Sequence, residues 1–328
     1  MVKRHGSFRC AIFAAVALVC AAAQVSAQNY PDKPVHIVVP LAPGGVTDIV
    51  ARLIAPKLAE RLGQPVIVDN RPGASQSIGS EYVARAPADG YTLIQATISS
   101  HAINASLYHN LRYSISKDFA AISQTTSQPL MLAVHPSVPA NTVPELIQAL
   151  KASPGKYSFG SAGGAGTSGH LAAELFKLKT GTSMVHIPYK GSGPMIIDLV
   201  GGQIHLAFDN MPTALAQVKA GRLKGLAITS TERSNLVPDI PTMSEFIPGF
   251  QVTAWQGLFA PAATPPAILD RLASEVQQIL RTPEIAKLLL ERGVIAVGSS
   301  RSEFTAFWKE EIERWAEVVK VSGARADN

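Results

Sequence analysis

Short apolar segments alternate with amphipathic helical segments along most of this chain of 328 residues. The alternation begins with a strand predicted over 35–42 and a helix over 47–62, whose apolar residues recur every three or four positions. It continues with strands predicted over 65–70, 91–97, 130–135, 157–162, 184–189, 204–209 and 223–229, and with helices over 77–85, 143–152, 168–179, 194–200 and 213–220. Such alternation is typical of βαβ units. It predicts an α/β fold in which mainly parallel sheets are flanked by helices.

The last quarter of the chain breaks this alternation. A strand predicted over 252–261 is followed by three helices, over 266–280, 283–291 and 302–321. A chain of about 300 residues commonly divides into two domains. We therefore expect two α/β lobes joined by two crossings of the chain, near 125–130 and 250–254.

The expected lobes are not contiguous in sequence. Residues 28–127 and the returning segment 253–328 form the first lobe, and residues 128–252 form the second. In this arrangement the C-terminal helices return to the first lobe, and a ligand cleft lies between the lobes. A single large doubly wound domain is the alternative that the same alternation permits.

The first 27 residues have the composition of a secretory signal. Basic residues at 3, 4 and 9 precede the apolar run 11–23, and the small residues Ser26 and Ala27 form a cleavage site. We expect export to the periplasm with cleavage before Gln28. A lipid anchor at Cys20 is the alternative, and the bulky Val19 in front of that cysteine disfavours it.

Loss of this segment changes what the composition implies. The whole chain has a net charge of +5, but without residues 1–27 there remain 26 basic and 24 acidic side chains, a net charge of +2. This near balance gives no support for a nucleic-acid partner. Cys10 and Cys20 also leave with the segment, which excludes disulfides, thiolate metal sites and cysteine nucleophiles from the mature chain. We expect no metal and no cofactor.

The stretch "YSFGSAGGAGTSGH" (157–170) combines a strand, a glycine-rich turn and the start of a helix. Its Gly164-x-Gly166-x-x-Gly169 has the spacing of a dinucleotide loop, but the next strand ends in "HIPYKGSG" with no acidic residue to bind ribose hydroxyls. A nucleophile elbow requires Gly-x-Ser-x-Gly, and Ser168 stands one position away from that pattern. Neither a dinucleotide site nor a hydrolase elbow is predicted here.

The same stretch fits an anion site. The first turn of a helix has unpaired N–H groups and a positive dipole end, and glycines allow close approach of a ligand to the backbone. Thr167 and Ser168 can cap the helix or donate hydroxyl groups. The alternative is a flexible turn followed by a capped helix, with no ligand.

The stretch "PLAPGGVTD" (40–48) repeats this design in the first half of the chain. Here we expect Asp48 to accept hydrogen bonds from backbone donors at the helix start and not to act as a general acid. Two further loops, over 96–101 and 186–194, also follow predicted strands. Loops at the carboxyl ends of parallel strands face the ligand crevice. Two helix N-termini, one from each lobe, are therefore expected to bind the two ends of a dianion.

Long stretches resemble one family of transport receptors. They include "PGGVTDIVARLIAPKLAERLGQPVIVDNRPGA" (43–74), "FGSAGGAGTSGHLAAELF" (159–176) and "FDNMPTALAQVKAGRLKGLAITS" (208–230). The sequence is similar, over essentially the whole mature chain, to the substrate-binding receptors of tripartite tricarboxylate transporters, the Bug receptor family. The resemblance implies a two-lobed periplasmic-binding-protein fold of type II that closes over a small carboxylate, bound through backbone groups and ordered water.

The resemblance also implies partners and site residues. The partners are permease subunits in the membrane, or a sensor kinase, and the receptor is expected to be a monomer without catalytic activity. The alternative, an exported hydrolase, requires a serine, a histidine and an acid together in the cleft. The implied ligand contacts are Leu41, Gly44, Gly45, Thr47, Asp48, Thr97 and Ser99 in the first lobe, with Ser161, Gly164, Gly166, Thr167, Tyr189 and Asp209 in the second. Many relatives have an aromatic residue at the position of Leu41, so the pocket size is expected to differ.

Overall fold

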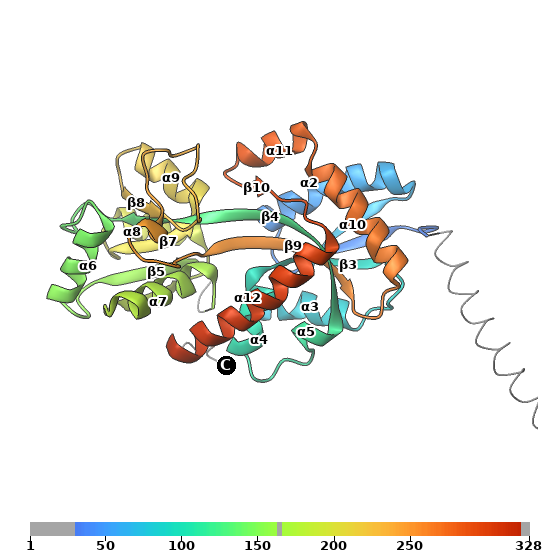
Figure 1. Cartoon of the computed structure of the whole chain (residues 1–328), viewed down its shortest axis with the longest axis horizontal. Helices are drawn as coiled ribbons and strands as arrows, with labels where there is room; N and C mark the ends of the chain where they lie inside the picture. The colour runs from blue at the N-terminus through green and yellow to red at the C-terminus, as the bar shows by residue number, and fades with distance from the viewer. Residues whose placement is uncertain (1–29, 163–165, 323–328) are drawn as a thin grey trace, which may run out of the picture.

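The computed structural model describes residues 30–162 and 166–322. The molecule is elongated, and two α/β lobes lie side by side along its long axis (Figure 1). Two long strands, β4 (Phe119–Val134) and β9 (Thr253–Pro261), run between the lobes. The helix α12 (Arg301–Ser322) crosses over these strands. The two-lobed α/β architecture expected from the sequence is confirmed.

The first lobe is built on a sheet with three parallel strands at one side. In spatial order these are β2 (Val66–Asn70), β1 (Val35–Val39) and β3 (Thr92–Thr97). The strand β9 pairs antiparallel with β3, and β4 pairs antiparallel with β9. A short strand, β10 (Ile295–Ala296), pairs antiparallel with β4. The helices of this lobe are α2 (Val46–Leu62), α3 (Ser77–Ala84), α4 (Asn104–Leu107), α5 (Ile115–Asp118), α10 (Pro266–Leu280) and α11 (Pro283–Leu290).

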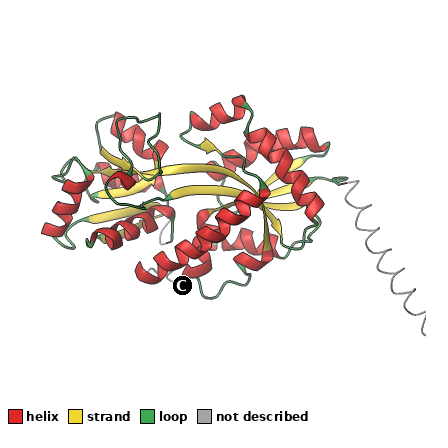
Figure 2. Ribbon diagram, in the orientation of Figure 1, coloured by secondary structure: helices red, strands yellow, loops and turns green. Residues whose placement is uncertain are grey.

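The second lobe has the same plan. Its parallel strands are, in spatial order, β6 (Val185–Tyr189), β5 (Ser158–Ala162) and β7 (Leu206–Asn210). The strand β4 pairs antiparallel with both β7 and β8 (Lys224–Ile228). The helices of this lobe are α6 (Val143–Ala152), α7 (Ser168–Thr180), α8 (Ser192–Val200) and α9 (Met211–Lys219). Figure 2 shows how the helices cover the strands of both lobes.

The strand β4 is where the structure departs most from the sequence prediction. A strand was expected only over 130–135, but β4 has 16 residues and begins at Phe119. Residues 119–129 pair with β9 in the first lobe, and residues 130–134 pair with β7 and β8 in the second. The proline at 129, which donates no hydrogen bond, stands at this change of partner, where a missing ladder bond is tolerated. The other predicted strands and helices end within three residues of the observed ones.

The helix α12 packs closely on β9 at one glycine. A Cβ atom at Gly257 would overlap the ring of Phe304, so a larger residue there would separate the helix from the strand. Trp308 adds an edge-on contact to Phe259, with ring centroids 4.9 Å apart. The far end of α12 packs against α7 in the second lobe. The helix therefore braces both lobes across the crossing strands. Within residues 30–162 and 166–322, no helix has the length and apolar character needed to cross a membrane.

Candidate ligand-binding site

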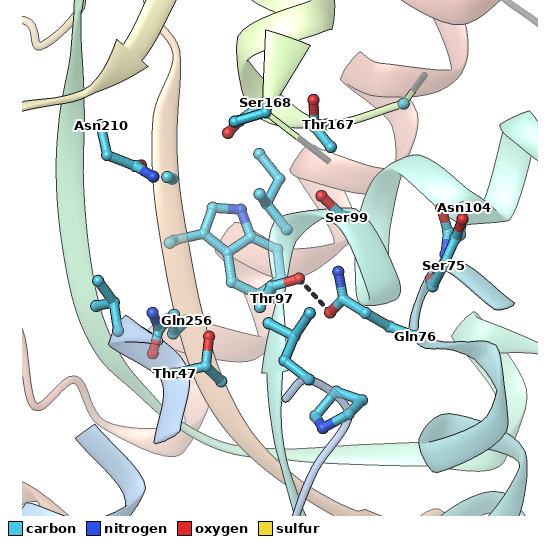
Figure 3. Close-up of a pocket in the computed structure, with 18 of the residues that line it drawn as sticks. Thr47, Ser75, Gln76, Thr97, Ser99, Asn104, Thr167, Ser168, Asn210 and Gln256 are labelled. Atoms are coloured by element: carbon cyan, nitrogen blue, oxygen red, sulfur yellow. Dashed lines mark hydrogen bonds between the residues drawn. The ribbon is translucent and has the colours of Figure 1, made fainter. Parts of the chain in front are cut away.

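A cavity of about 420 Å³ lies between the two lobes (Figure 3). The first lobe contributes the segments that follow β1, β2 and β3, and the second contributes those that follow β5, β6 and β7. The crossing strands complete the wall with Gln128, Trp255 and Gln256. All of these loops lie at the carboxyl ends of parallel strands, which is where ligands bind in open α/β sheets.

Several of the residues implied by the family resemblance meet at this cavity. They come from the loops after β1, β3 and β5, and they are Leu41, Thr47, Thr97, Ser99, Gly166 and Thr167. In sequence these residues are as much as 126 positions apart. The fold thus brings together hydroxyl groups of three threonines and a serine from both lobes.

The start of α7 is capped as the sequence predicted. Thr167 is the N-cap residue, and its Oγ1 accepts a hydrogen bond from the His170 backbone N–H at 3.5 Å. The backbone N–H of Gly166 donates to His170 Nδ1 at 3.1 Å, so this N–H is used within the protein. Burial is the main cause that lowers the pKa of His170 to about 3, and the nearby His186 adds to it. His170 is therefore a neutral acceptor that fixes the orientation of the Gly166 backbone, just before the start of α7.

Asp48 stabilises the loop over 41–48 through hydrogen bonds. Its side chain is not among the described residues that line the cavity. Its carboxylate is buried and accepts hydrogen bonds from the Gly44 N–H, from Arg52 and from Asn70, all at 3.0 Å. The hydrogen bond from Arg52 is the largest of the causes that lower the pKa of Asp48. Gly44 and Gly45 are exposed beside the cavity. In this structure Asp48 is a positioning residue for Thr47, as expected of an acid at a helix start.

Other implied residues are not among the described residues that line the cavity. Ser161 is fully buried, and its Oγ lies 2.6 Å from His186 Nε2. The Tyr189 hydroxyl donates to Asp198 Oδ2 at 2.7 Å, and desolvation is the main cause that raises the pKa of Tyr189 to about 12. Gly164 lies outside the described residues. Ser161 therefore supports the wall from within, whereas Tyr189 is half-buried and is held by Asp198.

Asp209, at the end of β7, is 2 % exposed and also lies behind the wall. Its Oδ1 accepts a hydrogen bond from Ser192 Oγ at 2.8 Å, whereas none of the described residues donates to Oδ2. Desolvation raises the pKa of Asp209 to about 6, although the bond from Ser192 acts in the opposite direction. The native state therefore holds the proton of this carboxyl more tightly than the unfolded chain does.

We expect Asp209→Asn to stabilise the protein at pH 8 and to have little effect at pH 4. Because the folded pKa of Asp209 is raised, its contribution to stability is present below pH 4 and is lost as the pH rises through about 6. The loss amounts to roughly 2–3 kcal/mol at about 1.4 kcal/mol for each pKa unit. Urea unfolding of the parent and the variant at both pH values measures this. An equal difference at pH 4 and pH 8 contradicts it.

Three side-chain amides that are not among the ligand contacts implied by the family resemblance also face the cavity (Figure 3). The amide oxygens of Gln76, Asn210 and Gln256 accept hydrogen bonds from Thr97 Oγ1 at 2.8 Å, Gln128 Nε2 at 2.9 Å and Gln95 Nε2 at 3.3 Å, respectively. Because each oxygen is engaged by the protein, each amide directs its NH₂ group, which only donates, away from that partner and toward the cavity. Gln76 follows β2, and Asn210 is the last residue of β7, so the strand-end rule that selected the other loops would also have selected them.

The lining carries little charge. Among the described residues that form it, Lys190 is the charged side chain, and none is acidic. The polar groups are hydroxyls and amides contributed from both lobes. A cavity rich in donors and without carboxylates suits an anion with several acceptor oxygens.

Two α/β lobes with a donor-rich cavity between them define a solute-binding receptor of the periplasmic-binding-protein fold. The chain belongs to the tripartite tricarboxylate transporter family receptors, whose TctC model matches residues 50–324. The protein BugT of Bordetella pertussis is 38 % identical over 306 residues, covering 93 % of this chain and 94 % of that protein.

Solved structures agree with this membership. The R. palustris protein Rpa4515 with adipate is 37 % identical, has a TM-score of 0.80 and is matched over 99 % of its length and 90 % of this chain. MatC (Rpa3494) from Rhodopseudomonas palustris with bound malate is 32 % identical with a TM-score of 0.76, and the match covers 100 % of that chain and 88 % of this one.

Proposed function

We propose that this receptor captures a small carboxylate or dicarboxylate between its lobes and delivers it to membrane permease subunits of a tripartite tricarboxylate transporter. The observation that carries the proposal is the set of hydroxyl and amide donors, with Lys190, around a cavity that has no acidic side chain among its described lining residues. The volume of about 420 Å³ falls within the range of roughly 300–1,000 Å³ that is usual for small-molecule sites. The adipate and malate bound by similar receptors support the same ligand class.

Binding without chemistry on the ligand is part of this proposal. Ser161 and His186 have the hydroxyl-to-imidazole contact of a nucleophile and its base. However, Ser161 is fully buried behind the wall, and His186 packs against the ring of His170, with centroids 4.1 Å apart. A buried hydroxyl cannot attack a ligand in the cavity. The pair is better explained as a structural contact between the neighbouring strands β5 and β6.

We also propose that the chain is exported, is cleaved before Gln28 and acts in the periplasm as a monomer. The basic residues, apolar run and small residues of its first 27 positions support the cleavage, and the family membership supports the location. Delivery to a permease is favoured over delivery to a sensor by the same membership.

One purification tests these proposals together. Protein isolated from the periplasm of its native host is analysed by mass spectrometry, which reads both its first residue and any released ligand. We expect Gln28 at the N-terminus and a carboxylic acid in the cavity. Titration calorimetry then compares adipate and malate with their diamides, which we expect to bind at least about tenfold more weakly, because hydrogen bonds to a charged acceptor are stronger. Equal affinity for an acid and its diamide contradicts the assigned ligand class.

A further inference from the structure

The turn that joins β2 to α3 has an unusual backbone. Its residues Ala74, Ser75 and Gln76 have φ angles of 44°, 49° and 75°, in the left-handed region that residues other than glycine rarely adopt. Three such residues in succession are strained, and strained residues of this kind cluster at ligand sites. Two questions follow: which contacts stabilise this strained turn, and which function its shape serves.

The surrounding structure holds the turn at three points. Asn104 Nδ2 donates to the Ser75 carbonyl at 3.0 Å, and the Tyr108 hydroxyl donates to Ser75 Oγ at 2.6 Å. Ser80 Oγ donates to the Gln76 carbonyl at 3.0 Å. These partners belong to α3, α4 and the residue after α4, so the left-handed shape is imposed by the first lobe itself.

The consequence of this shape is the placement of the Gln76 side chain. It lies at the cavity, beside Thr97 (Figure 3). The backbone N–H of Ser100 donates to Thr97 Oγ1 at 3.4 Å, and the Thr97 hydroxyl donates to Gln76 Oε1 at 2.8 Å. This chain of hydrogen bonds fixes which end of the amide faces the cavity. Gln76 Nε2 is left to donate to a ligand, and a nitrogen of this type cannot accept a hydrogen bond.

We propose that Gln76 is a specificity-determining residue that donates from Nε2 to one carboxylate of the bound ligand, and that the left-handed turn is retained because it places this amide. The inference rests on the proposed function, since it assigns a role in binding a carboxylate. Ser168 and Asn210 of the second lobe lie across the same cavity and meet the other end of the ligand (Figure 3), and Lys190 of that lobe also lines the cavity. Gln76 thereby favours an acid over its monoamide at the end held by the first lobe.

Two substitutions at this position separate binding from backbone strain. Gln76→Gly removes the amide and relieves the left-handed strain. We expect the affinity for adipate and malate to fall at least about tenfold relative to the parent protein, while the thermal midpoint stays equal or rises. A turn with only a structural role gives the opposite pattern, a lower thermal midpoint with unchanged affinity. Ala74→Gly is the matched control, because Ala74 has the same backbone strain but does not line the cavity. We expect its affinity to stay within about twofold of the parent.

Gln76→Glu tests the direction of the hydrogen bond. The glutamate keeps the length of the side chain and its contact with Thr97, but it presents a negative acceptor in place of a donor. Calorimetry compares adipate and malate with their monoamides. We expect the parent to prefer the acid and the variant to lose at least about 100-fold for the acid while binding the monoamide more tightly than the acid. An unchanged ratio of acid to monoamide affinity in this variant overturns the inference and leaves the proposed function standing. If the parent protein binds neither these acids nor any carboxylic acid released from the purified protein, the proposed function fails, and the role of Gln76 fails with it.

Discussion

Replacing Gly166 with alanine is expected to reduce ligand affinity at least about 100-fold, equivalent to about 3 kcal/mol, while the fold survives. Gly166 has a φ of +77°, and a Cβ atom on it would overlap Leu107 Cδ2 and lie 3.7 Å from Ile103 Cγ2. Leu107 and Ile103 belong to the first lobe, whereas Gly166 belongs to the second. One added methyl group therefore pushes the lobes apart at the edge of the cavity, where both lobes must contact the ligand.

The experiment needs a control for strain alone. Gly181 ends α7 with a φ of +64°, and a Cβ atom there would meet nothing within 4 Å. Gly181→Ala should therefore lower the free energy of unfolding by about 1 kcal/mol and leave ligand affinity unchanged. Calorimetry measures affinity, circular dichroism checks the fold, and small-angle scattering with and without ligand follows closure of the lobes. If folded Gly166→Ala protein binds and compacts like the parent, contact between the lobes at this glycine is not required for binding.

The sequence predicted the fold well because the signals for most of its elements are local. α10 is an example: Pro266 stands at its first turn, and Leu269, Leu272 and Val276 form one buried face. β4 was missed in part because its middle, residues 123–128, is polar, with Thr125, Thr126 and Gln128 among its buried residues. These side chains are buried only when the strand pairs with β9, and that pairing joins distant parts of the chain. A pattern in the local sequence therefore does not predict that these polar side chains become buried.

The sequence predicted those residues of the site that lie at or just after the carboxyl ends of strands. Thr97 and Thr167 follow apolar strands and precede helices, and both reach the cavity. Gln76 was missed because nothing in "PGASQS" predicts a left-handed conformation at three successive residues, none of which is glycine. Gln256 was missed because it lies inside β9, where the sequence does not distinguish a ligand-binding glutamine from an ordinary polar residue of a half-exposed strand. Both depend on tertiary contacts that impose a backbone shape or a strand register.

The largest effect on stability is expected at Glu311 of α12, which is 4 % exposed. Its Oε2 accepts hydrogen bonds from the indole nitrogens of Trp255 and Trp315, each at 2.9 Å, and Oε1 accepts one from Arg314 at 3.2 Å. The two indole rings are fully buried. Glu311→Ala removes the acceptor for both N–H groups and leaves them in an apolar environment. Each such loss costs about 1–3 kcal/mol, so we expect the free energy of unfolding to fall by about 3–5 kcal/mol.

This loss would be a large part of the total stability of about 5–15 kcal/mol that is usual for a folded protein. Urea unfolding followed by circular dichroism measures it, with Glu310→Ala as the matched control. Glu310 is the preceding residue on α12 and is exposed, so its replacement should change stability by no more than about 0.5 kcal/mol. A change at Glu311 as small as that at Glu310 contradicts the assignment. Because Trp255 also forms part of the cavity wall, the carboxylate of Glu311 links the bracing helix to the floor of the binding site. We therefore expect Glu311→Ala protein that remains folded to bind ligand more weakly than the parent, whereas Glu310→Ala protein should bind it equally well.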